Sequence, residues 1–345
     1  MAGLTFTSTI SMDLGSENTR VCTSADGSVF TCASKVLVSA ANSTDVLAVG
    51  DDAKRMEGRT GADSIPVSPI SYGGVAETEM AALLMLSAAE KATGRRHPFD
   101  KSRLVLTVPN GSTRVERAAL MNAAELAGAK HALFIESPVA AAVNMGRHIE
   151  KAEAQLIISI GACVTEVTLI SAYGVVLSRH SKTGSTAFDE AITRYVRSKP
   201  GLVISRFTAA ELKQNLGSAV VNETPCELTL RGMSLLTGRP ITAAVTGEDV
   251  RIAMESCIND LIASLCGALY NVPAEFSADV LKNGICLTGA GSTLHALGKR
   301  LEEETQLKVF MSSESGCDAV RGAFKIAGDD RPCRQIIASG SAYEI

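Results

Sequence analysis

The chain has 345 residues, more than one hydrophobic core usually holds, so two lobes are expected. Hydrophobic residues make up 46% of it and charged residues 20%, which excludes general disorder. The formal net charge of −4 gives no overall attraction to nucleic acid, and no nucleic-acid partner is expected.

The nine cysteines are scattered through the sequence without a CxxC pair. Such usage is typical of a reducing compartment, where cysteine behaves as a small buried hydrophobe. The N-terminal segment lacks the basic start and apolar run of a signal peptide, and no run of about 18 apolar residues follows. The sequence therefore predicts a cytoplasmic protein.

In the first half of the chain, short apolar runs alternate with segments whose apolar residues recur at helical spacing. Strands are predicted over 4–12, 20–30, 104–108 and 132–135, and the second of them turns at Asp26-Gly27. Helices are predicted over 77–91 and 113–127, followed by an Ala-rich helix through Met145. This alternation indicates an α/β fold with buried parallel strands.

The pattern restarts at Leu156. Strands are predicted over 156–160, 165–171, 175–178 and 284–287, and helices near 187–197, 209–216 and 248–269 and from Ser292. The strand, glycine turn and strand that begin before Asp13 are repeated around Gly161. A repeated unit of this kind predicts a duplication and two similar lobes.

Three glycine turns each follow an apolar strand. We name them the first turn (13–19, DLGSENT), the second turn (159–165, SIGACVT) and the third turn (288–291, TGAG). Small residues let backbone amides approach a phosphate, although any one of these turns alone could be ordinary turn chemistry. The chain has no GxxxxGK[ST] and no GxGxxG in a leading βαβ unit, so a Walker-type loop is excluded and a nicotinamide enzyme is disfavoured.

From about residue 10 to 328 the sequence resembles the MreB family of the actin, sugar-kinase and heat-shock-chaperone superfamily. The first turn resembles the family motif DLGTANT, and segment 49–60 (VGDDAKRMEGRT) resembles VGxxAKxMxGRTP. Segment 188–192 reads FDEAI as in the family, and 287–291 (LTGAG) is similar to its LTGGG. Segment 318–323 (DAVRGA) is closer to magnetosome actins than to ordinary MreB.

The resemblance implies an actin-like two-lobed α/β fold with four subdomains. Each lobe is expected to be a duplicated ribonuclease-H-like mixed sheet with helices. The first lobe is expected over 1–143 and 320–345, with subdomain IB at about 32–75. The second lobe is expected over 144–319, with subdomain IIB at about 182–242.

The resemblance also implies a bound nucleotide, ATP or ADP with Mg²⁺. Asp13 is the implied catalytic position of the first turn and holds the Mg²⁺ through water. The implied nucleotide-binding residues are Gly15, Ser16, Glu17, Asn18, Thr19, Gly161, Ala162, Cys163, Gly184, Glu211, Lys213, Gly289, Ala290, Gly291 and Ser292.

Three expected catalytic positions depart from the family. Segment 135–138 reads IESP instead of IEEP, so Ser137 replaces the glutamate that positions water. Glu136 is a second catalytic candidate, but it could substitute only if the local backbone rotated. In the second turn, Ser159 and Val164 replace the acid and the first threonine of DIGGGTT. These losses predict weak or absent ATP hydrolysis.

The resemblance implies a cytoskeletal filament protein that organises cell shape or wall synthesis, with itself and other MreB-type proteins as partners. The alternatives are a non-polymerising pseudo-ATPase that regulates such a filament and, third, an active chaperone or sugar kinase. The inner face of the cell membrane is a further expected location. Phe99, flanked by arginines in 95–100, is the candidate membrane anchor, and burial against its own domain is the competing interpretation.

Overall fold

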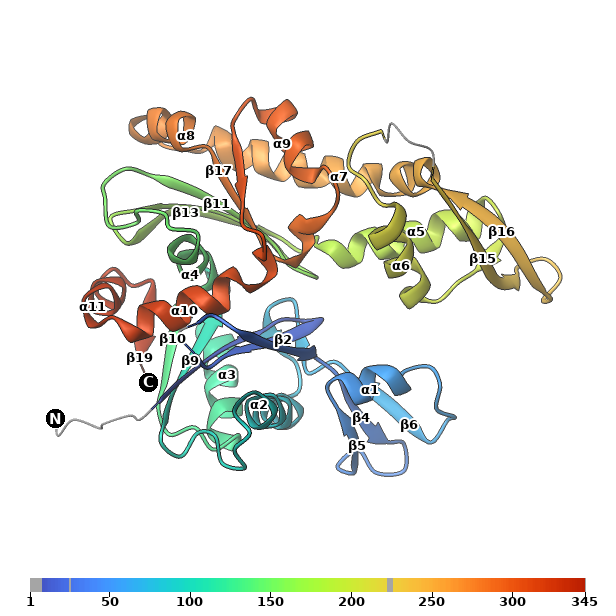
Figure 1. Ribbon diagram of the computed structural model, residues 1–345, viewed down its shortest axis with the longest axis horizontal. Helices are drawn as coiled ribbons and strands as arrows, with labels where there is room; N and C mark the ends of the chain where they lie inside the picture. The colour runs from blue at the N-terminus through green and yellow to red at the C-terminus, as the bar shows by residue number, and fades with distance from the viewer. Residues whose placement is uncertain (1–7, 25, 222–225, 345) are drawn as a thin grey trace. The chain divides into compact units, whose positions relative to one another are not determined.

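The computed structural model describes residues 8–24, 26–221 and 226–344 (Figure 1). The chain forms two compact units. Unit 1 contains the chain through Ile157, Thr168–Ser178 and the C-terminal part from Gly316. Unit 2 contains Ile158–Val167 and Arg179–Ser315.

Unit 1 is built on a six-stranded sheet with the order β19-β10-β9-β1-β2-β3. Its strands are β1 (Ser8–Leu14), β2 (Asn18–Cys22), β3 (Val29–Ala33), β9 (Ser102–Val108), β10 (Ala132–Glu136) and β19 (Ala342–Glu344). β1 pairs in parallel with β9 and antiparallel with β2, and β10 pairs in parallel with β9.

Helices cover both faces of this sheet. They are α2 (Thr78–Thr93), α3 (Arg114–Leu126), α4 (Ser137–Asn144), α10 (Asp318–Gly328) and α11 (Asp330–Ala338). Ile10 and Met12 belong to a core cluster with residues of α2 and α3, whereas the hydroxyl of Ser11 donates to the Val320 carbonyl of α10 at 2.9 Å. Alternate side chains of β1 therefore point to opposite helical layers, as the period of a strand requires.

A smaller part of unit 1 follows β3. It contains the three-stranded sheet β5-β4-β6, made of β4 (Val36–Ser39), β5 (Val46–Val49) and β6 (Ser64–Val67), together with α1 (Asp51–Met56). A two-stranded hairpin of β7 (Ile70–Ser71) and β8 (Gly74–Val75) leads on to α2.

A second large sheet has the order β13-β12-β11-β17-β18. Its strands are β11 (Gln155–Ile160), β12 (Thr165–Ser171), β13 (Gly174–Ser181), β17 (Ile285–Thr288) and β18 (Val309–Met311). The turn between β12 and β13 has positive φ at Ala172 and Tyr173 rather than at Gly174.

Unit 2 also contains a three-stranded sheet with the order β14-β15-β16 and most of the remaining helices. The strands are β14 (Leu202–Val203), β15 (Glu227–Ser234) and β16 (Pro240–Thr246). The helices are α5 (Ser185–Ser198), α6 (Arg206–Leu216), α7 (Gly247–Tyr270), α8 (Ser277–Asn283) and α9 (Leu297–Thr305).

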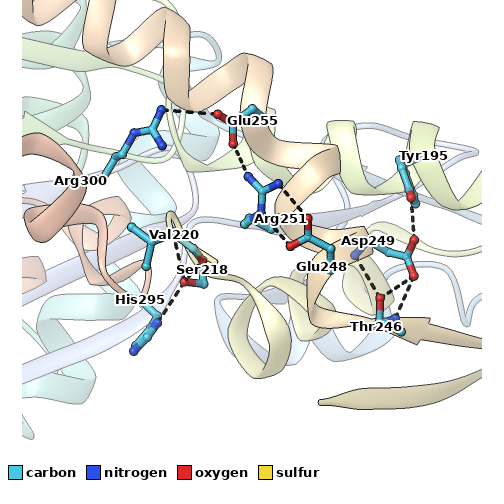
Figure 2. A network of polar contacts seen from close by, with 10 residues as sticks. All are labelled: Tyr195, Ser218, Val220, Thr246, Glu248, Asp249, Arg251, Glu255, His295 and Arg300. Atoms are coloured by element: carbon cyan, nitrogen blue, oxygen red, sulfur yellow. Dashed lines mark hydrogen bonds and ion pairs between the residues drawn. The ribbon is translucent and has the colours of Figure 1, made fainter. Parts of the chain in front are cut away.

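Polar contacts join α7 to its neighbours, as Figure 2 shows. Thr246 caps the helix by accepting from the Asp249 amide at 3.1 Å, and the Asp249 carboxylate accepts from the Tyr195 hydroxyl of α5 at 2.6 Å. Further along α7, the Glu255 carboxylate lies 3.5 Å from the Arg300 guanidinium of α9. Charge-assisted contacts therefore connect α7 to both α5 and α9.

Among the described residues, α7 is the one helix whose length and composition would suffice to cross a membrane. Its buried residues recur at helical spacing: Val250, Met254, Ile258, Leu261 and Leu265. This face packs against α5 and α6, so α7 is a core helix of unit 2.

Most of the predicted elements are confirmed. One prediction is wrong, because no α-helix starts at Ser292. A 3₁₀ turn, Ala290–Thr293, occupies this position, and α9 begins only after Ala296, which has a left-handed φ of 57°. Residues 4–7 of the first predicted strand lie outside the described residues. The lobe and subdomain boundaries stay predictions.

Phe99 is not a membrane anchor. Its side chain is 4% exposed and belongs to the same core cluster as α2 and β9. A side chain buried in this way cannot enter a bilayer without leaving the core, so the membrane prediction for Phe99 is wrong and the competing interpretation is confirmed.

Candidate functional site

The first turn is a tight connection between β1 and β2. The Gly15 amide donates to the Asn18 carbonyl at 3.1 Å. A Cβ on Gly15 would lie 2.7 Å from that carbonyl oxygen, closer than real Cβ atoms come. The turn therefore requires glycine at this position. Thr19 is buried at its far side, where its hydroxyl is 2.9 Å from that of Ser34, and Ser16 and Glu17 occupy the middle.

Asp13 is held in place by its partners across the sheet. The register puts it opposite Thr107 of β9 and Arg20 of β2. The Thr107 hydroxyl donates to Oδ1 at 2.8 Å, and the Arg20 guanidinium lies 3.6 Å from Oδ2. Asp13 is therefore a positioned and partly exposed carboxylate at the end of β1.

A divalent cation would find few protein ligands here. Across the described residues, no group of three or more His, Cys, Asp or Glu side chains could hold a metal ion. Mg²⁺ commonly uses one or two carboxylates together with water and substrate phosphates. Asp13 alone fits that pattern, and its role as a Mg²⁺ ligand through water stays a prediction.

The second turn is joined to the N-terminus of α5 by backbone hydrogen bonds within unit 2. The Gly161 amide donates to the Val164 carbonyl at 2.8 Å, which closes the turn. The Ser185 and Thr186 amides donate to the carbonyls of Gly161 and Ala162 at 3.0 and 2.9 Å. The turn and the start of α5 therefore form one rigid piece.

Gly184 makes this close approach possible. A Cβ on Gly184 would lie 2.4 Å from the Ala162 carbonyl oxygen and 2.7 Å from the Cys163 nitrogen. Both contacts are with backbone atoms, which cannot move aside as the end of a flexible side chain can. Gly184 is therefore needed for the packing of the turn, whatever else it contacts.

Two backbone donors remain available in the second turn. Within the described part of the chain, neither the Ala162 amide nor the Cys163 amide donates a hydrogen bond to another protein group. Both residues are half-buried, next to the N-terminus of α5. Unused amides beside a helix N-terminus are the arrangement that binds phosphate oxygens in proteins.

The third turn packs directly on the end of β11. A Cβ on Gly289, whose φ is 88°, would lie 2.4 Å from the Ile160 carbonyl oxygen. A Cβ on Gly291 would lie 2.5 Å from the Ile160 Cγ2 atom. The structure thus brings the second and third turns together within unit 2, with Ala290 between the two glycines.

Ser292 is held inside the third turn, and its predicted contact with the nucleotide stays a prediction. Its hydroxyl donates to the Gly289 carbonyl at 2.7 Å and lies 2.8 Å from the Ser315 hydroxyl, and its amide donates to Gly289 at 3.1 Å. The residue is 1% exposed. Both hydrogens that Ser292 can donate are therefore used inside the turn.

Lys213 joins α6 to the start of α5. Its ammonium group donates to the Ser185 carbonyl at 3.0 Å and lies 2.8 Å from the Asp189 carboxylate. Asp189 belongs to the FDEAI segment, and the sequence reasoning did not assign it a role at the site. Glu211, two residues before Lys213, is exposed on α6. Lys213 therefore holds the N-terminus of α5 beside the second turn.

The remaining catalytic candidates lie in unit 1, where β10 ends. The Ser137 hydroxyl donates to the Val108 carbonyl at 3.0 Å. Glu136 precedes it, and one of its carboxylate oxygens is buried without a hydrogen-bond partner among the described residues. Burial raises the pKa of Glu136, while a hydrogen bond from Asn110 and the charge of Arg117 act in the opposite direction.

Sequence reasoning also missed the aromatic neighbour of this carboxylate. Tyr343 of β19 stacks on Phe134 of β10 with 5.0 Å between ring centroids, and the Arg117 guanidinium lies 4.9 Å above the Tyr343 ring. Burial raises the pKa of Tyr343 to about 12. The only sequence signal for this cluster was an isolated tyrosine near the end of the chain.

Two βα-rich units carrying glycine turns define an actin-like nucleotide-binding fold. Among solved structures, MreB5 of Spiroplasma citri bound to ADP is similar, with a TM-score of 0.88 and 27% identity over 96% of this chain and 99% of that chain. The MamK double helical filament, with a TM-score of 0.76 and 22% identity over 93% of this chain and 99% of that chain, supports the fold alone. The predicted fold class is confirmed.

The chain belongs to the MreB/Mbl protein family, whose model matches residues 7–333. The cell shape-determining protein MreB of Escherichia coli K12 is 32% identical over 323 residues, which cover 93% of each chain. The cell shape-determining protein Mbl of Bacillus subtilis 168 is 30% identical over 315 residues, covering 91% of this chain and 94% of that protein. The predicted family resemblance is therefore confirmed.

Proposed function

We propose that this chain is a nucleotide-binding filament protein of the cell-shape class whose ATP hydrolysis is weak or absent. Two kinds of relative support the proposal. MreB5 of Spiroplasma citri has been solved with ADP and with AMPPNP, and MamK forms a double helical filament. The principal partner is a further copy of the same chain, and other MreB-type proteins are the second class of partner.

The second turn is the observation that carries the proposal. Its backbone has the two unused amides of Ala162 and Cys163 beside a helix N-terminus, which favours phosphate binding. Its side chains, however, supply neither an acid at Ser159 nor a hydroxyl at Val164. Binding depends on the backbone and hydrolysis on the side chains, so the two activities are separable here.

In unit 1, Asp13 of the first turn would hold Mg²⁺ through water. The bound metal would neutralise phosphate charge. Ser137 cannot align an attacking water as a glutamate would, since its hydroxyl already donates to Val108. Glu136 is the nearest remaining carboxylate in sequence, but it lies one residue before the lost glutamate, and neighbouring side chains point in different directions.

The proposed location is the cytoplasm, with the filament lying peripherally at the inner face of the cell membrane. This location follows from the cell-shape role of the relatives, because a protein that organises the wall must act close to the surface that carries it. Phe99 no longer supports the attachment, so another surface must provide it.

Filament formation and turnover are tested together by pelleting the purified chain with ATP, ADP or no nucleotide while phosphate release is followed. We expect a pellet and almost no phosphate. The matched variant carries Ser137→Glu, Ser159→Asp and Val164→Thr together, because groups that act as a unit recover their effect only together. We expect this variant to release phosphate about a hundredfold faster.

The proposed loss of hydrolysis would be refuted if the wild type released phosphate as fast as the triple variant and ordinary MreB proteins do. The absence of a pellet under every condition would refute the filament. It would favour the alternative of a non-polymerising regulator, and co-pelleting with an added MreB-type protein would then be the next measurement.

Nucleotide binding has a separate test in the alkylation rate of Cys163. The thiol lies in the second turn, 3.8 Å from the Thr186 hydroxyl, so a bound phosphate would cover it. We expect saturating ATP to slow alkylation of Cys163 at least about tenfold, the scale of a site protected by tight binding. Cys266, which is exposed on α7, is the internal control and keeps its rate. An unchanged rate at Cys163 would refute nucleotide binding in this turn.

A further inference from the structure

A cation lies directly beside Asp13, the carboxylate that would hold Mg²⁺. The antiparallel register of β1 and β2 places Arg20 opposite Asp13. Residues opposite each other in an antiparallel pair point to the same face of the sheet, with their Cβ atoms about 5 Å apart. Nη1 of Arg20 lies 3.6 Å from Oδ2 of Asp13. Arg20 is therefore an immediate neighbour of this carboxylate.

Both oxygens of Asp13 already have a partner. The Thr107 hydroxyl of β9 donates to Oδ1 at 2.8 Å, while Oδ2 faces the Arg20 guanidinium. Among the described residues, these two side chains are the only partners of the Asp13 carboxylate. The carboxylate is thus fixed between a hydroxyl donor on one neighbouring strand and a cation on the other.

The ion pair is largely shielded from solvent. The Asp13 side chain is 23% exposed and the Arg20 side chain 13%. On its other side Arg20 lies opposite Thr31 of β3, which carries no charge. Within the part of the chain that the structure describes, Asp13 is the only charged partner of Arg20. Salt screens a partly buried pair less than an exposed one, so the two charges still interact at physiological ionic strength.

Arg20 reduces the attraction of Asp13 for a divalent cation. A guanidinium stays protonated throughout the physiological pH range, so its charge is permanent. It balances the negative charge of Asp13 at short range and repels a second cation that approaches the same carboxylate. A carboxylate that holds a metal ion through water depends on this charge, because it forms no direct bond to the ion. Asp13 is therefore a weaker Mg²⁺ ligand than an unpaired aspartate would be.

The nearest other acids in sequence do not replace Asp13. Glu17 lies within the first turn, and Glu166 directly follows the second turn on β12. Both residues already interact with another group of the protein, and Glu166 is 6% exposed. In the second turn, Ser159 occupies the position of the acid. Asp13 therefore remains the principal candidate for the metal ion, and its ion pair decides how much that ion contributes.

The phosphate donors of the second turn do not require a metal ion. The amides of Ala162 and Cys163 are neutral donors beside the N-terminus of α5, and they can bind a phosphate oxygen with or without a cation on it. At the first turn, an unpaired Asp13 would repel a nucleotide that carries no metal ion. Arg20 cancels this repulsion. The chemistry of both turns is thus compatible with a metal-free nucleotide.

We infer that Arg20 makes nucleotide binding by this chain nearly independent of Mg²⁺. Arg20 is a specificity-determining residue in this sense, because its charge decides whether the first turn accepts a nucleotide without the metal ion. This role of Arg20 rests on the proposed function, since it requires that the chain bind nucleotide. It depends neither on filament formation nor on the loss of hydrolysis.

The test is equilibrium binding of a fluorescent ATP analogue to the purified full-length chain, with saturating Mg²⁺ or with EDTA. We expect the two dissociation constants of the wild type to agree within about threefold. Arg20→Met removes the charge and keeps a long side chain. In EDTA its affinity should fall at least about tenfold, because Asp13 is then unbalanced, and Mg²⁺ should restore most of the loss.

Two control variants separate charge from packing and position. Arg20→Lys keeps the positive charge without the planar fork, so it should bind with the weak Mg²⁺ dependence of the wild type. Arg334→Gln removes an exposed arginine of α11 and should also behave as the wild type does. Circular dichroism of each variant verifies that it is folded. A Mg²⁺ dependence that appears equally in Arg20→Met and Arg20→Lys would overturn the role of the charge.

A double variant assigns the effect to Asp13. Asp13→Asn combined with Arg20→Met removes both charges of the pair, so binding should again be nearly the same with Mg²⁺ and with EDTA. If the double variant kept the Mg²⁺ dependence of Arg20→Met, another acid such as Glu17 or Glu166 would hold the metal ion. That result would overturn the inference.

The wild type itself separates this role of Arg20 from the proposed function. Tight binding with Mg²⁺ and a loss of at least about tenfold in EDTA would overturn the inference and leave nucleotide binding intact. An Arg20→Met variant that is as insensitive to Mg²⁺ as the wild type would do the same. If neither the wild type nor any variant bound the analogue, and ATP did not protect Cys163, nucleotide binding itself would be refuted and the role of Arg20 with it.

Discussion

Gly322 lies at a close backbone contact between α10 and α4 in unit 1, so Gly322→Ala is an informative substitution. It lies in α10, inside the segment 318–323 that resembles magnetosome actins. A Cβ at this position would lie 1.7 Å from the Ala140 carbonyl oxygen and 2.4 Å from its carbonyl carbon in α4. Both are backbone atoms, so the overlap cannot be relieved by a change of rotamer.

The size of the effect follows from this overlap. Real Cβ contacts are not shorter than 3.0 Å, so α10 and α4 would have to separate locally by about 1.3 Å. A gap of that size removes much of the dispersion energy between the facing surfaces. It would also stretch the 2.7 Å hydrogen bond from Asn144 of α4 to Asp318 of α10. We therefore expect a loss of about 3 kcal/mol in the free energy of unfolding, at the upper end for overpacking.

Thermal unfolding followed by circular dichroism measures this loss. About 3 kcal/mol corresponds to a fall in Tm of roughly 6–12 °C for a unit of this size. Gly267→Ala in α7 is the matched control, because a Cβ there meets nothing within 4 Å. The control should be neutral or up to about 1 kcal/mol more stable, since alanine favours a helix. A Gly322→Ala variant within about 0.5 kcal/mol of the wild type would refute the reasoning.

Three further substitutions test the site. Gly184→Ala should destabilise the second turn by about 1–3 kcal/mol and abolish ATP protection of Cys163, because the new Cβ would meet the Ala162 carbonyl at 2.4 Å; intact protection would contradict this. Glu136→Gln tests the pKa of Glu136, which burial raises from its ordinary 4.5. Because the pKa of Glu136 is raised in the folded state, the protonated side chain contributes its full share of stability below pH 4.5, and this share is lost as pH rises through the folded-state pKa. The variant should therefore gain stability relative to the wild type between pH 4.5 and neutrality. Urea midpoints across that range measure the gain, and a difference that does not change with pH would contradict it. Tyr343→Phe should remove the latest phase of an ultraviolet tyrosine titration, near the pKa of about 12, and leave the earlier phases; a late phase that persists would show that another tyrosine is the buried one.

The sequence predicted the local elements well, because their signals are local. β1, β9, β10 and β11 are short apolar runs that end in glycine or proline turns, and the structure has them at the expected places. Chain duplication and motif likeness gave the fold class, which depends on element order rather than on individual contacts.

Predictions failed where the answer depended on distant contacts. Phe99 has basic and polar neighbours in the sequence whether its side chain faces solvent or the core. Only its packing with α2 and β9 decides which of the two it faces. The helix expected from Ser292 is delayed by Ala296, whose left-handed backbone no propensity scale predicts for alanine. The pairing of Lys213 with Asp189 links two helices and left no pattern in either one.

The glycines of the second and third turns deserve a different interpretation from the one that motif matching suggests. Gly184, Gly289 and Gly291 each lie where a Cβ would meet backbone or a buried side chain at 2.5 Å or less, so the packing of unit 2 alone requires them. Their presence therefore does not by itself indicate phosphate chemistry. Ala162 and Cys163, in contrast, do favour phosphate binding. The turn has room for their Cβ atoms, and both of their amides are left without a hydrogen bond to another described protein group.

If nucleotide binding depends on these amides, it should tolerate side-chain changes at 162 and 163 that leave the backbone in place. Cys163→Ser should therefore retain nucleotide affinity within about threefold, a difference below 1 kcal/mol. Gly184→Ala, which displaces the same backbone, should lose it. Equilibrium binding of a fluorescent ATP analogue compares the two variants directly. Loss of affinity in Cys163→Ser with retention in Gly184→Ala would show that side chains, not the backbone, hold the phosphate.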